Sequence, residues 1–167
     1  MSLVERKERL EHFFAAHRES GLPVTTQRRA VFDAILDRTD HPTAEHLYSE
    51  VRHQLPQISR MTVHRILGNF VSLGLVAKTC HPGSAARFDP KLDQHHHLVC
   101  LDCGRIMDVD TPRLDHLPWP EVNPREFQIQ DYRVHFQGRC ARCSKKLGAL
   151  KIRSNTAASK RSKSKKI

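Results

Sequence analysis

The stretch SRMTVHRILGNFVSLG, residues 59–74, decides the fold of the first half of the chain. Ser59 is a suitable residue to cap a helix N-terminus, and Gly74 is a suitable residue just beyond a C-terminus. Apolar side chains recur between them at helical spacing, namely Val63, Ile66, Leu67, Phe70 and Leu73. We therefore predict a helix from Arg60 to about Leu73 that buries one stripe and leaves its polar residues on the other faces.

Three further helical patterns precede this helix, and a hairpin pattern follows it. The helices are predicted from Val4 to about Arg18, from Thr25 or Thr26 onward, and from His41-Pro42-Thr43 up to Pro56. Short strands are predicted at 75–80 and 87–89, joined by a turn at 81–84. Together these elements predict a winged helix-turn-helix domain over residues 1–89, the arrangement that lays one helix in the major groove of DNA.

A second domain is predicted over residues 95–147, after a hinge at 90–94. Apolar residues alternate at 97–100, 105–109, 127–129 and 132–136, which predicts four strands. Pro112, Pro118, Pro120 and Pro124 leave room only for short helical turns between the second and third strands. The chain is therefore expected to have an α+β fold, with a small α/β second domain and a basic, disordered tail at 148–167.

The charge is concentrated in that tail. The formal net charge is +10, and residues 151–167 contribute seven positive charges and no acid. The tail is either a solvated terminus or a non-specific arm for phosphate, whose contribution would fall as salt rises. With no apolar run long enough for a membrane span and no export leader, the sequence favours a cytoplasmic protein.

Four of the five cysteines form two C-x-x-C pairs, Cys100 with Cys103 and Cys140 with Cys143. Two such pairs can surround one tetrahedral zinc ion and leave no open coordination position. We predict a structural zinc site of four thiolates, one ion per subunit, in preference to two separate redox motifs. Cys80 stands outside this set and is expected to pack beside the wing as a small apolar residue.

A second set of potential metal ligands combines imidazoles and carboxylates. His95 and His97 share one face of a predicted strand, and Asp108 lies on the next strand. Asp89 and His41 belong to the first domain. Such ligands suit iron, manganese or zinc better than calcium. The alternative is a solvated histidine run with ordinary surface acids.

The chain resembles the ferric uptake regulator (Fur) family over roughly residues 10–146. The motifs that carry the resemblance are Thr26-Gln27-Arg28-Arg29, His41-Pro42-Thr43-Ala44, Thr62-Val63-His64-Arg65, Arg87-Phe88-Asp89, His95-His96-His97-Leu98-Val99-Cys100, Cys103-Gly104-Arg105-Ile106-Met107-Asp108 and Gly138-x-Cys140-x-x-Cys143. The resemblance implies a homodimeric, metal-dependent repressor of transcription that binds a double-stranded DNA operator. It also implies that the second domain forms the dimer interface.

In this family a regulatory ferrous or manganous ion lies between the domains, one per subunit. By position its ligands here are His41, Asp89, His95, His97 and Asp108. The iron-sensing branch usually has Glu where this chain has Asp89 and Asp108, whereas the peroxide-sensing branch has Asp at both positions. In the latter branch, iron and hydrogen peroxide oxidise ligand histidines, here His41 and His95, and DNA is released. We therefore expect a peroxide-responsive repressor, with an iron-responsive or a zinc-responsive uptake regulator as the alternatives.

Three positions depart from the family pattern. His64 replaces a usual tyrosine of the recognition helix. A further metal site of the iron branch is poorly matched by Gln94, His96, Asp115 and Tyr132, and we do not predict it. The prolines at 118, 120 and 124 fall where the family has a helix.

The expected DNA contacts come from the predicted recognition helix. Arg65 and His64 are the candidates for base edges, with Arg60 and Thr62 on phosphate or base. Arg28 or Arg29 is either a phosphate contact or a solvated helix charge. An enzyme with a small-molecule substrate is not expected, because four thiolates leave zinc no position for water and no His-x-Glu step accompanies the cysteines. A structural zinc-ribbon adaptor without a DNA-binding switch remains a rival from another class.

Overall fold

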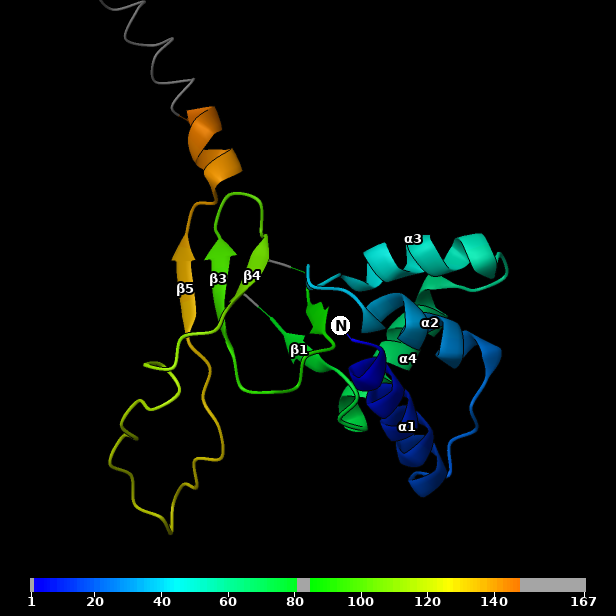
Figure 1. Ribbon diagram of the computed structural model, residues 1–167, viewed down its shortest axis with the longest axis horizontal. Coiled ribbons are helices and arrows are strands. Elements are labelled where there is room, and N and C mark those ends of the chain that lie inside the picture. The colour runs from blue at the N-terminus through cyan, green and yellow to red at the C-terminus, as the bar shows by residue number, and fades with distance from the viewer. Residues whose placement is uncertain (1, 81–84, 148–167) are drawn as a thin grey trace, which may run out of the picture. The chain divides into compact units, whose positions relative to one another are not determined.

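The computed structural model describes residues 2–80 and 85–147 (Figure 1). The predicted turn at 81–84 and the basic tail therefore lie outside the described residues. The chain divides into two compact units, residues 1–94 and 95–167. Among the described residues, no helix has the length and apolar character needed to cross a membrane.

The first unit contains the four predicted helices, α1 (Leu3–Glu19), α2 (Thr26–Leu36), α3 (Ala44–Gln54) and α4 (Arg60–Ser72). Each begins at a hydroxyl side chain that accepts a hydrogen bond from a backbone N–H of the first turn, and these caps are Ser2, Thr25, Thr43 and Ser59. Gly74 follows α4 with a positive φ of 64°, which lets the chain leave the helix and enter the wing. The helix predictions are confirmed.

An aromatic cluster forms the centre of this unit. Phe13 of α1, Phe32 of α2 and Phe70 of α4 are fully buried. The ring centroid of Phe13 lies 4.5 Å from that of Phe32 and 5.9 Å from that of Phe70. Each buried ring contributes about 2–3 kcal/mol of hydrophobic stabilisation, so this cluster anchors α4 against the helices before it.

The wing is a two-stranded antiparallel sheet of β1 (Ala77–Thr79) and β2 (Arg87–Asp89). On its other side, β2 contacts the segment that precedes α3. Thr43 forms an isolated antiparallel bridge with Arg87, and the N–H of Phe88 donates to the Pro42 carbonyl over 3.0 Å. The two predicted strands and their antiparallel pairing are confirmed, with a first strand shorter than expected, and β2 lies between β1 and the start of α3.

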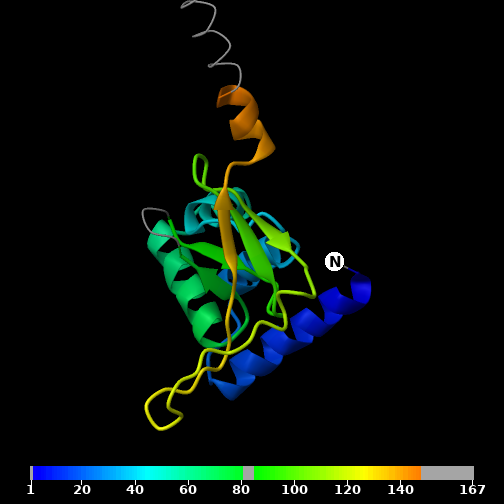
Figure 2. The same ribbon diagram turned by 90° about the vertical axis from the view of Figure 1, so that its left-hand side faces the viewer.

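The second unit is built on a three-stranded sheet in the order β4-β3-β5, which is labelled in Figure 1 and turned by 90° in Figure 2. Strand β3 (His96–Cys100) pairs antiparallel with β4 (Ile106–Val109) and parallel with β5 (His135–Gly138). A parallel neighbour requires a long return of the chain, which residues 110–134 provide. We call this stretch the connecting segment, and it loops out beyond one end of the sheet in both views.

The connecting segment corrects one prediction. Residues 127–129 are not a strand, and Phe127 is 63% exposed. Alternating apolar residues cannot form a strand without a hydrogen-bonding neighbour, and the sheet gives its one free place beside β3 to residues 135–138. The last predicted strand therefore begins three residues later than expected. Residues 141–147 are helical.

Candidate metal centres and nucleic-acid interface

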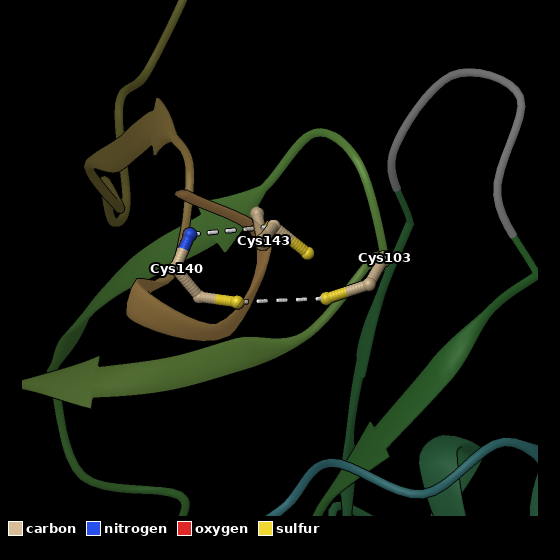
Figure 3. Close-up of side chains that lie close together, drawn as sticks. Cys103, Cys140 and Cys143 are labelled. Atoms are coloured by element: carbon tan, nitrogen blue, oxygen red, sulfur yellow. Dashed lines mark hydrogen bonds between the residues drawn. The ribbon is translucent and has the colours of Figure 1, made fainter. Parts of the chain in front are cut away.

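The four predicted zinc-ligating cysteines meet at one end of the second unit's sheet. Cys100 ends β3, Cys103 lies in the following turn, and Cys140 and Cys143 follow β5. Their sulfur atoms all lie within 4.8 Å of one another. The Sγ atoms of Cys103 and Cys140 are 3.8 Å apart, with Cys143 beside them (Figure 3). Zinc–sulfur bonds of about 2.3 Å in a tetrahedron require sulfurs about 3.8 Å apart, so this group fits a zinc ion.

Backbone hydrogen bonds shape the turn between the first two cysteines. The N–H of Gly104 donates to the Cys100 carbonyl over 2.8 Å, and the N–H of Cys100 donates to the Arg105 carbonyl over 2.9 Å. Gly104 has a φ of 65°, a left-handed conformation that a side chain would strain. The glycine after the first C-x-x-C pair thus closes the turn that points both sulfurs to the same place.

Other backbone N–H groups of this site favour the thiolate form at two of the cysteines. The N–H of Cys140 donates to Cys100 Sγ over 3.3 Å and, with the N–H groups of Cys103 and Asp102, lowers the pKa of Cys100 to about 6. The N–H of Cys143 lowers the pKa of Cys140. The hydrogen bond with Cys140, followed by burial, raises the pKa of Cys143 to about 12. Several thiolates in one place repel each other, and a divalent cation removes that repulsion.

Cys80 does not join this cluster. It is exposed, whereas its neighbour Thr79 on β1 is buried. Successive strand residues point to opposite faces, so burying Thr79 turns Cys80 outward. The expectation that Cys80 packs beside the wing as an apolar residue was wrong.

The first unit brings together two of the five predicted regulatory ligands. His41 lies between α2 and α3, and Asp89 ends β2. The Nε2 atom of His41 is 3.2 Å from Oδ2 of Asp89. His41 has a φ of 49°, uncommon for a residue with a side chain, and its carbonyl accepts a hydrogen bond from the Arg87 guanidinium over 2.9 Å. The pairing of β2 with the start of α3 therefore sets this geometry.

The second unit brings together the other three. His97 is the Cα partner of Asp108 in the antiparallel pair of β3 and β4. The ring centroids of His95 and His97 are 4.6 Å apart, and His95 Nε2 lies 3.8 Å from Asp108 Oδ1. Both imidazoles are buried. Two rings and a carboxylate converging on one face are a suitable partial site for a borderline divalent metal.

Sequence reasoning missed His135. It is the Cα partner of His97 in the parallel pair of β3 and β5, and the two ring centroids are 5.1 Å apart. His135 is placed beside His97 only if β5 runs parallel to β3, and the sequence around residue 135 does not indicate a parallel strand. His135 is therefore a neighbour of the proposed ligand His97.

The predicted DNA-contacting residues lie on the first unit. Arg60, His64 and Arg65 are exposed on α4, and Thr62 is half-buried. The backbone N–H of Thr62 donates to the Ser59 hydroxyl over 3.0 Å, and its own hydroxyl lies 2.9 Å from that hydroxyl. Arg28, at the start of α2, donates to the Pro23 carbonyl. Thr62 and Arg28 thus have local structural roles whatever else they contact.

Arg60 is engaged by α3. Its Nε lies 2.9 Å from Oε2 of Glu45, and its guanidinium lies over the Tyr48 ring at 4.6 Å from the centroid. The hydrogen bond from Arg60 also lowers the pKa of the Glu45 carboxyl, so the pair is ionised at neutral pH. Among the described residues, Arg65 has no ion-pair partner, so its guanidinium is available to contact another molecule.

Comparison with known proteins matches the model of the Ferric uptake regulator family to residues 19–137. The peroxide operon regulator of Bacillus subtilis is 32% identical over 146 residues, which are 87% of this chain and 98% of that protein. A peroxide-responsive repressor of Staphylococcus epidermidis is 31% identical over 134 residues, 80% of this chain and 89% of that one. The ferric uptake regulator of Helicobacter pylori has a similar fold, with a TM-score of 0.69 at 19% identity, covering 83% of this chain and 93% of that one.

Proposed function

The chain belongs to the ferric uptake regulator family, and from this premise we propose that it is a metal-dependent, peroxide-responsive repressor of transcription. It would bind operator DNA as a homodimer in the cytoplasm and catalyse no reaction on a small-molecule substrate. The observation that carries the proposal is the division of the ligands. His41 and Asp89 are held together in the winged-helix unit, and His95, His97 and Asp108 are held together in the other unit.

The switch follows from this division. A ferrous or manganous ion that takes ligands from both units binds only the arrangement that brings those units together, and it stabilises that arrangement by its differential affinity. In a homodimer, the same arrangement would fix the spacing of two α4 helices. Two recognition helices reach successive major grooves only when they lie about one helical turn of DNA apart. Metal binding would thereby become operator binding.

The four-cysteine site has a separate role. Zinc held by Cys100, Cys103, Cys140 and Cys143 has no open position, so it stabilises the second unit and takes no part in sensing. The pKa values of Cys100 and Cys140 are lowered, which favours the thiolate form that zinc binds, whereas the pKa of Cys143 is raised. We propose one such ion per subunit.

The choice of peroxide as the signal rests on two carboxylates and on the relatives. Positions 89 and 108 hold aspartate where the iron-sensing branch usually has glutamate, and the two curated relatives named above are peroxide regulators. Bound ferrous iron would supply one electron to hydrogen peroxide, and hydrogen peroxide would be the oxidant of the imidazoles beside the ion. His41 and His95, as ligands, are the rings we expect to be oxidised, and their loss would release DNA.

The DNA contacts are proposed from the exposed side of α4. Arg65 and His64 would contact base edges, since neither is held by a hydrogen bond or ion pair among the described residues. Arg60 and Thr62 would lie at phosphate or at the edge of the base contacts. Arg28 would approach the phosphate backbone from α2.

The test is DNA binding by anaerobically purified protein with defined metals. We expect fluorescence anisotropy of an operator fragment to show binding with ferrous iron or manganese, and none after the regulatory metal is removed. Hydrogen peroxide should abolish binding by the iron-loaded protein and spare the manganese-loaded protein, which is the matched control. Operator binding that is the same with and without the regulatory metal would favour a zinc-ribbon adaptor. Metal-dependent binding that survives peroxide in the iron-loaded protein would favour an iron-responsive regulator.

A further inference from the structure

His96 lies between two proposed metal ligands but faces the other side of β3. It is fully buried. Its Nδ1 accepts a hydrogen bond from the N–H of Val134 over 3.2 Å. Its Nε2 lies 3.2 Å from Oδ1 of Asp115. His96 therefore contacts the connecting segment through a hydrogen bond at Nδ1 and through the approach of Asp115 to Nε2.

Tyr132 extends this cluster. Its ring is nearly parallel to that of His96, with an interplanar angle of 19° and 6.1 Å between centroids. Its hydroxyl donates to the Leu114 carbonyl over 2.5 Å and accepts from the N–H of Leu117 over 3.0 Å. The two ends of the connecting segment are thus joined to each other and to the back of β3.

We propose that His96, Asp115 and Tyr132 form a metal-independent brace that holds β3 in register and positions His95 and His97 on the opposite face. The inference rests on the proposed function, because it concerns how the regulatory ligands are placed. A slip of one residue would turn both imidazoles away from Asp108, so a contact that fixes the strand from behind also fixes the metal-facing side. Val134 strengthens this link, since its carbonyl accepts from the N–H of His97 over 3.0 Å.

The chemistry of the cluster favours a brace over another metal site. His96 and Asp115 are its only ligand-type side chains, apart from a tyrosine hydroxyl already bound to two backbone groups. Among the described residues, groups of three or more potential ligands include neither of the two. Two ligands and no third make a weak cation site, whereas a buried imidazole facing a carboxylate is a stable polar contact by itself.

The test compares Asp115→Ala with Asp115→Asn and with the control Glu121→Gln. Asparagine keeps an oxygen that can face His96 Nε2, while Glu121 is an exposed acid of the same segment outside the cluster. Manganese affinity, measured by isothermal titration calorimetry on zinc-loaded protein, should fall about tenfold in Asp115→Ala, as when support of a ligand histidine is lost. It should recover largely in Asp115→Asn and stay unchanged in Glu121→Gln.

A second measurement needs neither manganese nor DNA. Trp119 is the only tryptophan in the chain, and its ring packs edge-on against Tyr132 at 5.6 Å. Its fluorescence anisotropy in zinc-loaded, manganese-free protein should fall in Asp115→Ala and not in Glu121→Gln. Equal anisotropy in the parent and Asp115→Ala would overturn the metal-independent brace, and so would equal manganese affinity. A second manganese equivalent in the parent that disappears in Asp115→Ala would show a metal site instead. A parent that binds manganese without DNA coupling would contradict the proposed repressor and leave both readouts of the brace intact.

Discussion

The imidazole of His41 and the carboxylate of Asp89, which lie far apart in the sequence of the winged-helix unit, are 3.2 Å apart in the structure. Two backbone features place them there. The segment before α3 pairs with β2, and the Arg87 guanidinium donates to the carbonyl of His41 while that residue holds a left-handed conformation. The wing thus prearranges this pair of proposed metal ligands, and the strand β2 that carries Asp89 follows the proposed recognition helix α4 in the same unit.

Arg87→Ala should weaken regulatory metal binding. Without the guanidinium, the strained conformation of His41 loses a charge-assisted hydrogen bond that stabilises it by about 1.5–3 kcal/mol. We expect manganese affinity to fall about tenfold in calorimetry, since 1.4 kcal/mol corresponds to a factor of ten. Lys78→Ala, on the exposed side of the paired strand, is the control and should bind like the parent. If both variants bind manganese like the parent, the guanidinium does not position His41.

Asp108→Glu should separate metal-dependent DNA binding from peroxide response. The longer side chain keeps a carboxylate but moves it relative to His95 and His97. We expect operator binding with manganese to persist and loss of binding after peroxide to become slow in the iron-loaded variant. Mass spectrometry of the peptides that contain His41 and His95 should show less added oxygen than in the parent. Unchanged sensitivity and oxidation would remove the aspartate as a reason for assigning a peroxide signal.

Cys143→Ser should release the structural zinc and destabilise the second unit. A four-thiolate site stabilises the folded state by several kcal/mol, and the loss of one ligand removes much of that. The expected result is less than one zinc per subunit by metal analysis and a clearly lower Tm. Cys80→Ser is a matched control, because Cys80 is exposed and outside the cluster. A variant that retained full zinc and the parent Tm would exclude Cys143 as a ligand.

Arg65→Ala should relax the sequence preference of DNA binding. A base-edge contact by a guanidinium is worth about 1–3 kcal/mol of discrimination. We expect affinity for the operator to fall by roughly tenfold or more, with a smaller change on random DNA of the same length and salt. Equal losses on both DNAs would make Arg65 a phosphate contact instead.

The Arg60–Glu45 pair should persist throughout the neutral range. Arg60 holds the pKa of Glu45 below its usual 4.5, so the pair's contribution is complete above pH 4.5 and is lost as pH falls through the lowered value. An NMR titration should show a Glu45 pKa below 4.5 in the parent and close to 4.5 in Arg60→Ala. Because Arg60 stays with Glu45, we also expect Arg60→Ala to affect base preference less than Arg65→Ala. A Glu45 pKa that does not respond to Arg60→Ala would contradict the pairing.

Much of the first unit could be predicted because its signals are local. The ends of the helices are set by hydroxyl caps, by apolar residues at helical spacing and, after α4, by a glycine. Each of these signals acts on residues that are only a few positions away in the sequence. The four-cysteine site could also be predicted in part from local sequence, because the two cysteines of each C-x-x-C pair are close enough to bind one ion. The false strand at 127–129 shows the limit of this reasoning, because alternation cannot tell whether a neighbouring strand exists.

The sequence by itself determined the four helices, the wing, the two cysteine pairs and the histidines that share a face of β3. Only the tertiary structure decided that β5 lies parallel to β3 and brings His135 beside His97, that Glu45 holds Arg60, and that Asp115 faces His96. The physical reason is the range of the interactions. Caps and periodicity act within one or two turns of the chain, whereas strand register and ion pairs depend on loop closures whose cost and direction no local pattern records.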